Sequence, residues 1–407
     1  MSEIKKMLRE FGLLTKLYII LSLVVIFSGS NYISNYCMQI LSIMVVISIF
    51  TTKIKDVKRS SFFIKKDKFI FILMVLINLF LVWQLQNSFS KNTSLVFIMR
   101  FIVYALLIAI IYKMEVFYTI IKLSKIYSIV VAFSILIETV ITGEKSGGLI
   151  GDYQYVGIIM CIMSGIFIAS IYCEKNKLDV IGLIVIVTTL LTSGKRSLTI
   201  IVVIGYLAIF LISSRKDKII RFLKINSILA LSISLAYLFI PQVRLVFERF
   251  MYYSGDKTLN GRMFYWSSAI EIWQNNTFTG IGMGSFSKYF DIYYHRLGNL
   301  EAYDAHNIYI QMLAEIGTIG FLLFCSLFII AFIKTFIMAR DKYVRQNSRY
   351  QLIIYFSFYI QVWFIIYGFS GNALYGPSQF YIYILSIAMM ISVKTRIYFN
   401  ECFKTTI

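Results

Sequence analysis

Apolar runs recur along this 407-residue chain, and each is long enough to cross the roughly 30 Å hydrocarbon core of a bilayer. A backbone in lipid must satisfy its own hydrogen bonds, so such runs form helices. Hydrophobic residues make up 59% of the chain and charged residues only 15%, which is too little polar material for the surface of a soluble chain this long. The sequence therefore predicts an all-α, polytopic integral membrane protein. About twelve transmembrane helices are expected, at 13–29, 33–52, 68–86, 94–112, 124–142, 153–173, 178–194, 197–213, 225–241, 307–333, 351–369 and 377–393.

The distribution of charge predicts how these spans are oriented. The chain has 40 basic and 20 acidic residues, and a net charge of +20 would suggest nucleic acid binding in a soluble protein. With both termini in the cytoplasm, 29 of the 40 basic residues fall in inner segments, with groups at 53–68 and 215–224. The twelve-span topology thus obeys the positive-inside rule, and no nucleic acid partner is expected. The seventh and eighth runs are barely separated, so eleven or thirteen crossings remain open.

Connections of uneven length divide the chain into three parts. Residues 1–241 hold the first nine spans, residues 242–306 form one large extracytoplasmic loop, and residues 307–407 hold the last three spans. A loop this long is usually functional or disordered, and its aromatic content argues against disorder. The five cysteines lie within spans or at their inner edges, without a disulfide framework or a metal-binding spacing. No cofactor and no metal are expected, and the basic N-terminus leads into a first anchor without a cleavable signal.

Within the large loop, residues 262–274 predict a helix in the membrane interface. Met263, Trp266, Ile270 and Trp273 fall on one apolar stripe, and indole rings suit the headgroup boundary. Arg262 is then expected at the start of this helix, where free backbone N–H groups and a guanidinium would bind an anion. The alternative is that Arg262 extends to lipid phosphates.

Two further basic positions lie near the outer membrane surface. Lys195 and Arg196 occupy a tight outer turn, where a charge is costly without a partner, and an anion would be that partner. The alternative is an ordinary turn charge. Arg100 lies inside the outer edge of the fourth span and is expected to face the bundle or a wet cavity, or to pair with Glu138 of the fifth span.

A histidine stands where the loop meets the tenth span. His306 follows Glu301 and Asp304, and Glu315 comes nine residues later in the span; the loop also contains His295. A histidine titrates near neutral pH, so His306 is a candidate proton acceptor on the outer side. A lone loop histidine without a chemical role is the alternative.

Two sequence runs in and after the large loop combine several uncommon features. In "GRMFYWSSAIEIWQNNTFTGIGMGSF" an arginine precedes an aromatic-rich helix and a glycine turn, and "AHNIYIQMLAEIGTIGF" opens a helix with a histidine-asparagine pair. Together these runs resemble the signature of the O-antigen ligase/polymerase superfamily of bacterial envelope polysaccharide enzymes. The turn "SGKRS" is similar to an arginine-containing end of an earlier span in that family, although "SR" is commoner there. The matching residues are Gly280, Gly282, Gly284 and Phe286 in the turn and His306, Asn307, Glu315, Gly317 and Gly320 in the helix.

This resemblance implies a GT-C-like glycosyltransferase in the bacterial cytoplasmic membrane, with an extracytoplasmic active site. The donor and the acceptor would be oligosaccharides on undecaprenyl diphosphate, and the reaction would be inverting and metal-independent. His306 would take the proton of the acceptor hydroxyl, with Glu315 or Asp304 orienting the imidazole. The leaving diphosphate would be stabilised by a basic set: Arg196 and Arg262, with Lys195 and Arg100 as further candidates.

Three functions remain in view from the sequence. The first is a polymerase of O-antigen, capsule or exopolysaccharide repeat units, working with a chain-length regulator and a flippase. The second is a ligase that transfers glycan from the lipid diphosphate to another acceptor. The third is a flippase or transporter of lipid-linked oligosaccharides, which would predict two related halves with broken helices at matching positions. The chain places its unusual residues in one asymmetric loop, which argues against the transporter. Of the two enzymes, which share the signature, the repeat-unit polymerase is the favoured function.

Overall fold

The computed structural model describes residues 7–29, 31–51, 67–110, 114–174, 176–251, 257–294 and 304–404. Within these ranges the chain is 84% helical and has no strand, which confirms the predicted all-α class. The predictions that concern His295, Glu301 and the basic residues at 53–66 fall outside the described residues. The helices are α2 (Leu13–Phe27), α3 (Asn31–Thr51), α5 (Lys68–Gln84), η1 (Leu85–Asn87), α6 (Lys91–Ile110), α7 (Met114–Thr142), η2 (Gly148–Ile150), α8 (Tyr153–Cys173), α9 (Leu178–Thr192), α10 (Arg196–Ile212), α11 (Lys218–Phe239), α12 (Pro241–Met251), α13 (Lys257–Asn275), α14 (Phe286–Tyr293), α16 (Ile308–Arg340), α17 (Lys342–Gln346), α18 (Ser348–Tyr367) and α19 (Pro377–Lys404).

Each of the twelve predicted spans falls on one of these helices. Seven of the described helices are long and apolar enough to cross a membrane: α5 with η1, α7, α8, α11, α16, α18 and the main part of α19. The apolar helices α2, α9 and α10 are shorter. The chain is therefore a polytopic membrane protein, and a total of twelve crossings stays a prediction.

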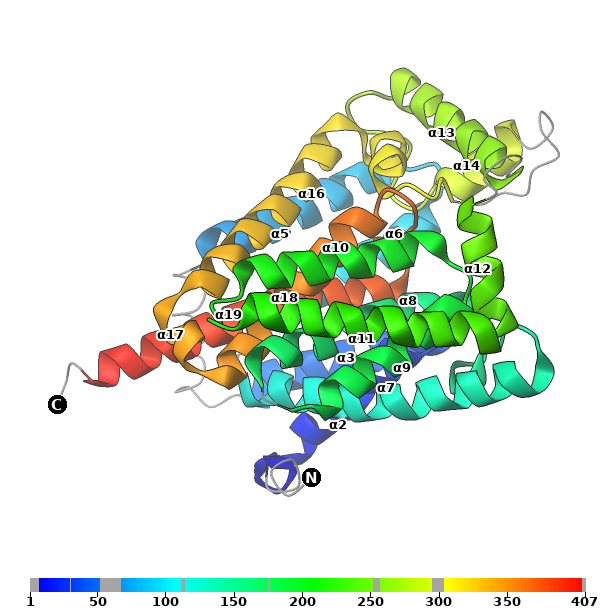
Figure 1. Ribbon diagram of the computed structural model, residues 1–407. Helices are drawn as coiled ribbons and strands as arrows, with labels where there is room; N and C mark the ends of the chain where they lie inside the picture. The colour runs from blue at the N-terminus through cyan, green and yellow to red at the C-terminus, as the bar shows by residue number, and fades with distance from the viewer. Residues whose placement is uncertain are drawn as a thin grey trace.

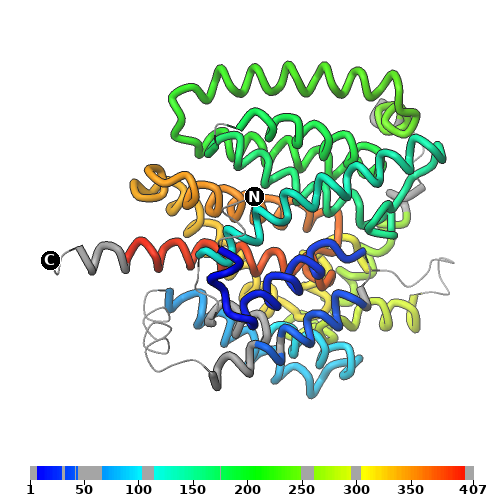
Figure 2. The backbone as a smooth tube through the Cα atoms, turned by 90° about the horizontal axis from the view of Figure 1, so that it is seen from below, coloured from blue at the N-terminus to red at the C-terminus, as the bar shows by residue number. Residues whose placement is uncertain are grey.

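Helix α8 forms the centre of the bundle. Its residues from Val156 to Tyr172 are all buried, as expected for a helix that is apolar on every side. It packs against α9, α10 and α18, and α18 packs in turn against α19. Figure 2 places α11 at one edge of the bundle and α5 and α6 at the opposite edge. Exposed apolar residues such as Leu231 and Leu238 on α11 suit contact with lipid.

The segment between α11 and α16 gathers at one end of the bundle. Helices α12, α13 and α14 lie together there, and α13 packs against the first part of α16 (Figure 1). In the described residues 242–251, 257–294 and 304–306, this segment is thus largely helical, at the end where α10 and α16 begin.

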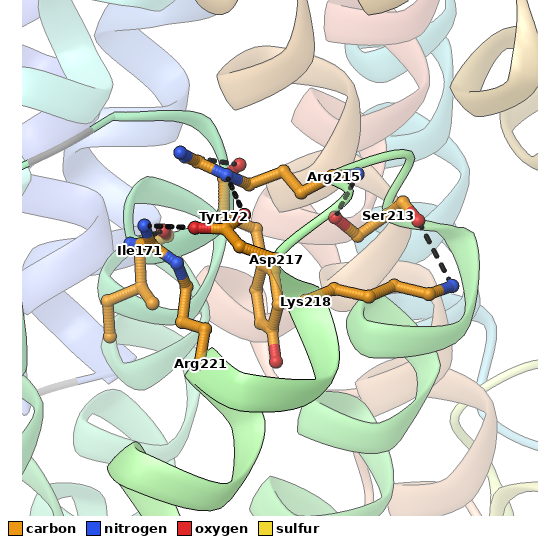
Figure 3. A network of polar contacts seen from close by, with 7 residues as sticks. All are labelled: Ile171, Tyr172, Ser213, Arg215, Asp217, Lys218 and Arg221. Carbon is orange, nitrogen blue, oxygen red and sulfur yellow. Dashed lines mark hydrogen bonds and ion pairs between the residues drawn. The ribbon is translucent and has the colours of Figure 1, made fainter.

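Basic residues at the opposite end of the bundle cap helix C-termini. Arg215 lies in the turn between α10 and α11, and its Nη1 donates to the carbonyl oxygen of Tyr172 at 3.3 Å; Arg221 lies in the first turn of α11, and its Nη1 donates to the carbonyl oxygen of Ile171 at 3.0 Å (Figure 3). Asp217 accepts from both guanidinium groups, at 3.0 and 2.9 Å. The last carbonyls of α8 are therefore satisfied by cations, which the helix dipole also favours.

Candidate active site

Helix α16 begins directly after His306. The Asn307 side chain caps it by accepting from the backbone N–H groups of Tyr309 at 3.0 Å and Ile310 at 3.3 Å. His306 has a φ of 53°, and it is the one non-glycine residue with positive φ within the described ranges. Such a backbone costs on the order of 1–3 kcal/mol and persists only where its surroundings hold it. The candidate proton acceptor therefore has a constrained backbone.

Helix α16 is broken two residues after Glu315. Gly317 has φ 61° and ψ −171°, so the helical bonds are interrupted there. The chain before α14 takes their place: Ile281 N–H donates to the carbonyl of Ala314 at 3.1 Å, and Gly282 N–H donates to that of Glu315 at 2.7 Å. The exposed backbone groups of the break are thus paired with residues 280–286, which we call the glycine loop.

The glycine loop requires its glycines for two reasons. Gly280, Gly282 and Gly284 all have positive φ, which L side chains rarely adopt. They also lie against other residues, since a Cβ on Gly280 would be 2.3 Å from the carbonyl carbon of Glu315 and one on Gly282 would be 2.1 Å from Ser88 Oγ. The three matching glycines therefore form the contact surface between the loop, α16 and the turn after α5.

The carboxylate of Glu315 fastens the glycine loop to α16. It is fully buried, and it accepts from Gly284 N–H at 2.7 Å and from Phe286 N–H at 2.9 Å. Gln311 Nε2 lies 3.3 Å from the same carboxylate. All three of these groups donate, so they bind the carboxyl oxygens of Glu315 as acceptors. These contacts assign Glu315 to the loop, whereas its predicted role was to orient the imidazole of His306.

Asp304 lies closer to the predicted chemistry. Its Oδ1 accepts from Gln311 Nε2 at 3.1 Å and from Ser287 Oγ at 3.4 Å. Its negative charge also raises the pKa of His306. Asp304 is therefore both fixed in place and near the imidazole.

Three charged residues from different segments act electrostatically on His306. Burial lowers the pKa of His306 below its ordinary value, and the positive charges of Arg262 and Lys195 lower that pKa further, against the effect of Asp304. The structure thus brings together residues from α13, from the start of α10 and from the start of α16. A histidine in such a place is neutral near pH 7 and free to accept a proton.

The predicted position of Arg262 at a helix start is wrong. Helix α13 begins at Lys257, so Arg262 lies more than one turn inside it. The apolar stripe also differs from the prediction: Met263 and Ile270 are exposed, but Trp266 Nε1 donates to the carbonyl of Ala305 at 2.9 Å. Trp273 Nε1 donates to Thr318 Oγ1 at 3.2 Å. The two indoles thus hold α13 against the start of α16. Tertiary packing, which local spacing does not show, decides where α13 begins and which of its faces is buried.

A helix start is found instead at the second basic pair. Lys195 is the N-cap of α10 and Arg196 is its first residue. Burial lowers the pKa of Lys195, and Arg262 and Lys145 lower it further while Asp152 opposes them. The free N–H groups of α10 and its dipole thus add to the positive charge next to His306, and this is a suitable place for an anion.

Arg100 has partners elsewhere. Its Nη2 donates to Asn35 Oδ1 at 2.7 Å, and its guanidinium lies over the ring of Phe97 at 5.1 Å from the centroid. The carboxylate of Glu138, its predicted alternative partner, accepts from Ser146 Oγ and from Gly148 N–H. Asn35 joins α3 to α6, so the contacts of Arg100 support packing between these helices.

Sequence reasoning missed two buried glutamines. Gln84 Nε2 donates to the carbonyls of Thr279 and, at 2.6 Å, of Glu315, so it braces the glycine loop and the broken helix together. Gln311 contacts Asp304, Ala305 and Glu315. Burying a glutamine without hydrogen-bond partners costs free energy, so a glutamine within an apolar run indicates that partners are present. This is the sequence feature from which both residues could have been found.

Residues 181–325 match the family model described as O-antigen ligase. The matched segment runs from α9 to the first half of α16. It contains Lys195, Arg196, Arg262, Asp304, His306 and Glu315, and Arg100 lies before it. No curated protein matches the chain. His306, Arg262 and Lys195 thus lie inside a segment that is similar to the O-antigen ligase family over about a third of the chain.

Proposed function

We propose that this protein is a glycosyltransferase that joins undecaprenyl-diphosphate-linked oligosaccharide repeat units. The observation that carries the proposal is the group formed by His306, Arg262 and Lys195, in which a constrained histidine with a lowered pKa stands beside two cations. This pairing of a base with an anion site is what transfer from a lipid diphosphate requires. The family match over the same segment supports the class of reaction.

The proposed reaction is a single displacement. The oxygen of an acceptor sugar hydroxyl attacks the anomeric carbon of the donor, and the bond from that carbon to the diphosphate oxygen breaks. The hydroxyl proton passes to His306, and the bonding electrons leave with the diphosphate. Arg262, Lys195 and Arg196 at the start of α10 face the growing negative charge. The configuration at the anomeric carbon inverts, and neither a metal nor a cofactor takes part.

The site and its substrates are proposed to lie on the outer face of the bacterial cytoplasmic membrane, with both termini in the cytoplasm. The caps of α8 by Arg215 and Arg221, far from the candidate site, agree with the positive-inside rule. A chain-length regulator and a flippase are the proposed partners. Labelling of single cysteines from outside intact cells tests the orientation: positions on α13 should react and positions between α10 and α11 should not.

The decisive experiment uses the purified protein in lipid nanodiscs with a defined lipid-linked repeat unit. We expect a ladder of products, each longer by one repeat, with the new linkage inverted by NMR. His306→Ala should stop the ladder while the protein keeps its elution profile and its helical circular dichroism. A normal ladder from this variant would contradict the role of His306. Vesicle transport without any new glycosidic bond would contradict an enzyme and support a flippase.

A ligase is the second candidate, since the matching family is described as O-antigen ligase. The same base and the same anion site would serve it, but the acceptor would not be a second repeat unit. The product lengths separate the two: a ligase with repeat units alone gives no ladder, and it transfers a preformed glycan once when an acceptor of another class is added.

A further inference from the structure

The Gln311 side chain has three hydrogen-bond partners near the start of α16. It lies in the first turn of the helix and is 1% exposed. Its Oε1 accepts from Ala305 N–H at 2.9 Å, and its Nε2 donates to Asp304 Oδ1 at 3.1 Å and to Glu315 Oε1 at 3.3 Å. The amide orientation follows from these partners, because a backbone N–H needs an acceptor and two carboxylates need donors.

The contacts of Gln311 fix the backbone on the N-terminal side of His306. Ala305 is completely buried, and its N–H is held by Gln311 while its carbonyl oxygen accepts from Trp266 Nε1. On the other side, Asn307 is held as the cap of α16. The strained φ of His306 thus lies between two restrained neighbours, which is the condition under which such strain persists.

The same amide also links the histidine segment to the glycine loop. The path runs from Ala305 through Gln311 to Glu315, whose carboxylate holds the N–H groups of Gly284 and Phe286. A buried amide with all its donors and its acceptor in use is expensive to disturb. The histidine segment and the glycine loop are therefore connected through two buried side chains, those of Gln311 and Glu315.

We infer that Gln311 is a positioning residue: it holds Ala305 and Asp304 so that the His306 imidazole is presented to the acceptor hydroxyl, and it couples that placement to the glycine loop. This inference rests on the proposed function. The alternative is a purely structural glutamine, whose loss would lower stability and leave turnover per folded molecule unchanged.

The first test compares Gln311→Met with a matched control, Gln361→Met. Gln361 is also 1% exposed, and its Nε2 donates to Thr335 Oγ1 at 2.9 Å in the packing of α18 on α16. Gln311→Met should lower kcat roughly 10- to 100-fold, as expected for a misplaced reacting group, with the KM for the lipid-linked donor within about threefold. Gln361→Met should lower the thermal midpoint and keep kcat. An equal kcat in the two variants would overturn the inference.

The second test is rescue by protonation in Gln311→Glu. A protonated glutamic acid offers one donor and one acceptor and so replaces most of the amide, but the ionised form only accepts and faces Asp304 and Glu315. The other charged groups that act here are His306, Arg262 and Lys195. We expect the kcat of Gln311→Glu, divided by that of wild type at the same pH, to rise as pH falls from about 8 to about 5.5. A flat or falling ratio would overturn the inference.

A structural readout separates this inference from the proposed function. Hydrogen exchange of residues 304–310 should quicken in Gln311→Met and stay at the wild-type rate in Gln361→Met, whether or not polymer forms. If the wild-type protein makes no product from the donor, the proposed function is contradicted, and the exchange measurement still decides the positioning role of Gln311. If exchange at 304–310 is unchanged in Gln311→Met, the positioning role fails.

Discussion

The replacement of Glu315 by Gln tests whether this carboxylate anchors the glycine loop. The two oxygens of Glu315 each accept from one loop N–H, at 2.7 Å from Gly284 and 2.9 Å from Phe286. A glutamine keeps one oxygen and turns its NH₂ group toward the other donor. One hydrogen bond to a charged acceptor is lost and one buried N–H loses its partner, and together these cost roughly 2–4 kcal/mol.

This cost converts into an exchange rate. If the loop opens locally before its amides exchange, a loss of roughly 2–4 kcal/mol raises the open population about 30- to 700-fold. Hydrogen exchange of residues 280–290 by mass spectrometry measures this ratio directly. The matched control is Glu248→Gln, because Glu248 is exposed on α12, a helix that packs against α9 and α11. Its exchange at 280–290 should equal that of wild type.

The outcome distinguishes an anchor from a reacting group. An anchor predicts faster exchange in the loop and a fall in turnover that follows the loop opening. If Glu315→Gln leaves the exchange at 280–290 unchanged and still abolishes turnover, the anchoring argument is refuted, and the carboxylate then acts in the chemistry.

Three further predictions concern the site. Arg262→Lys should lower kcat/KM roughly 10²-fold with a defined donor, because a point charge lacks the bidentate fork; wild-type turnover would mean that Arg262 only contacts lipid. The proposed base is neutral His306, so activity should rise with pH through its lowered pKa. This acid limb of the pH profile should move to higher pH in Lys195→Gln and to lower pH in Asp304→Asn. A shift in the same direction in both variants would contradict the assigned charges. Gly317→Ala should lower the thermal midpoint, since positive φ alone costs roughly 1–2 kcal/mol and the Cβ would lie 2.3 Å from the Phe278 carbonyl carbon, whereas Gly261→Ala meets nothing within 4 Å.

The sequence predicts the existence of the helices well, because a long apolar run in lipid has few other conformations. It predicts their ends less well. Helix α7 begins at Met114, ten residues before the predicted start, because Lys122 pairs with Glu174 at 2.6 Å at that end of the bundle. Helix α11 begins at Lys218, where Arg221 caps α8. Charged residues that end an apolar run therefore continue the helix when they find partners.

The same limit applies to the site, because the sequence indicates the candidate residues but not the contacts between segments that are far apart in the chain. The sequence named His306, Asp304, Arg262 and Lys195, and the structure places the last three within electrostatic range of His306. It could not show which carboxylate serves which partner, because Glu315 is fixed by amides of residues about thirty positions earlier. Local spacing also placed Arg262 at a helix start, since it lacked the packing of α13 on α16.

The break in α16 explains why the glycine loop belongs to the membrane bundle. Four backbone bonds join residues 277–282 to residues 314–319, among them Thr318 N–H to the Thr277 carbonyl at 2.8 Å. If the loop detached, the Ala314 carbonyl would face an apolar interior unpaired, at a cost of several kcal/mol, and the Glu315 carbonyl would keep only Gln84 Nε2 as a partner. We therefore expect the loop to stay docked, so that the proposed lipid-linked donor would enter the site past other segments. Substitutions of its glycines should then act on folding, whereas substitutions of Arg262 and His306 should act on turnover in a folded protein.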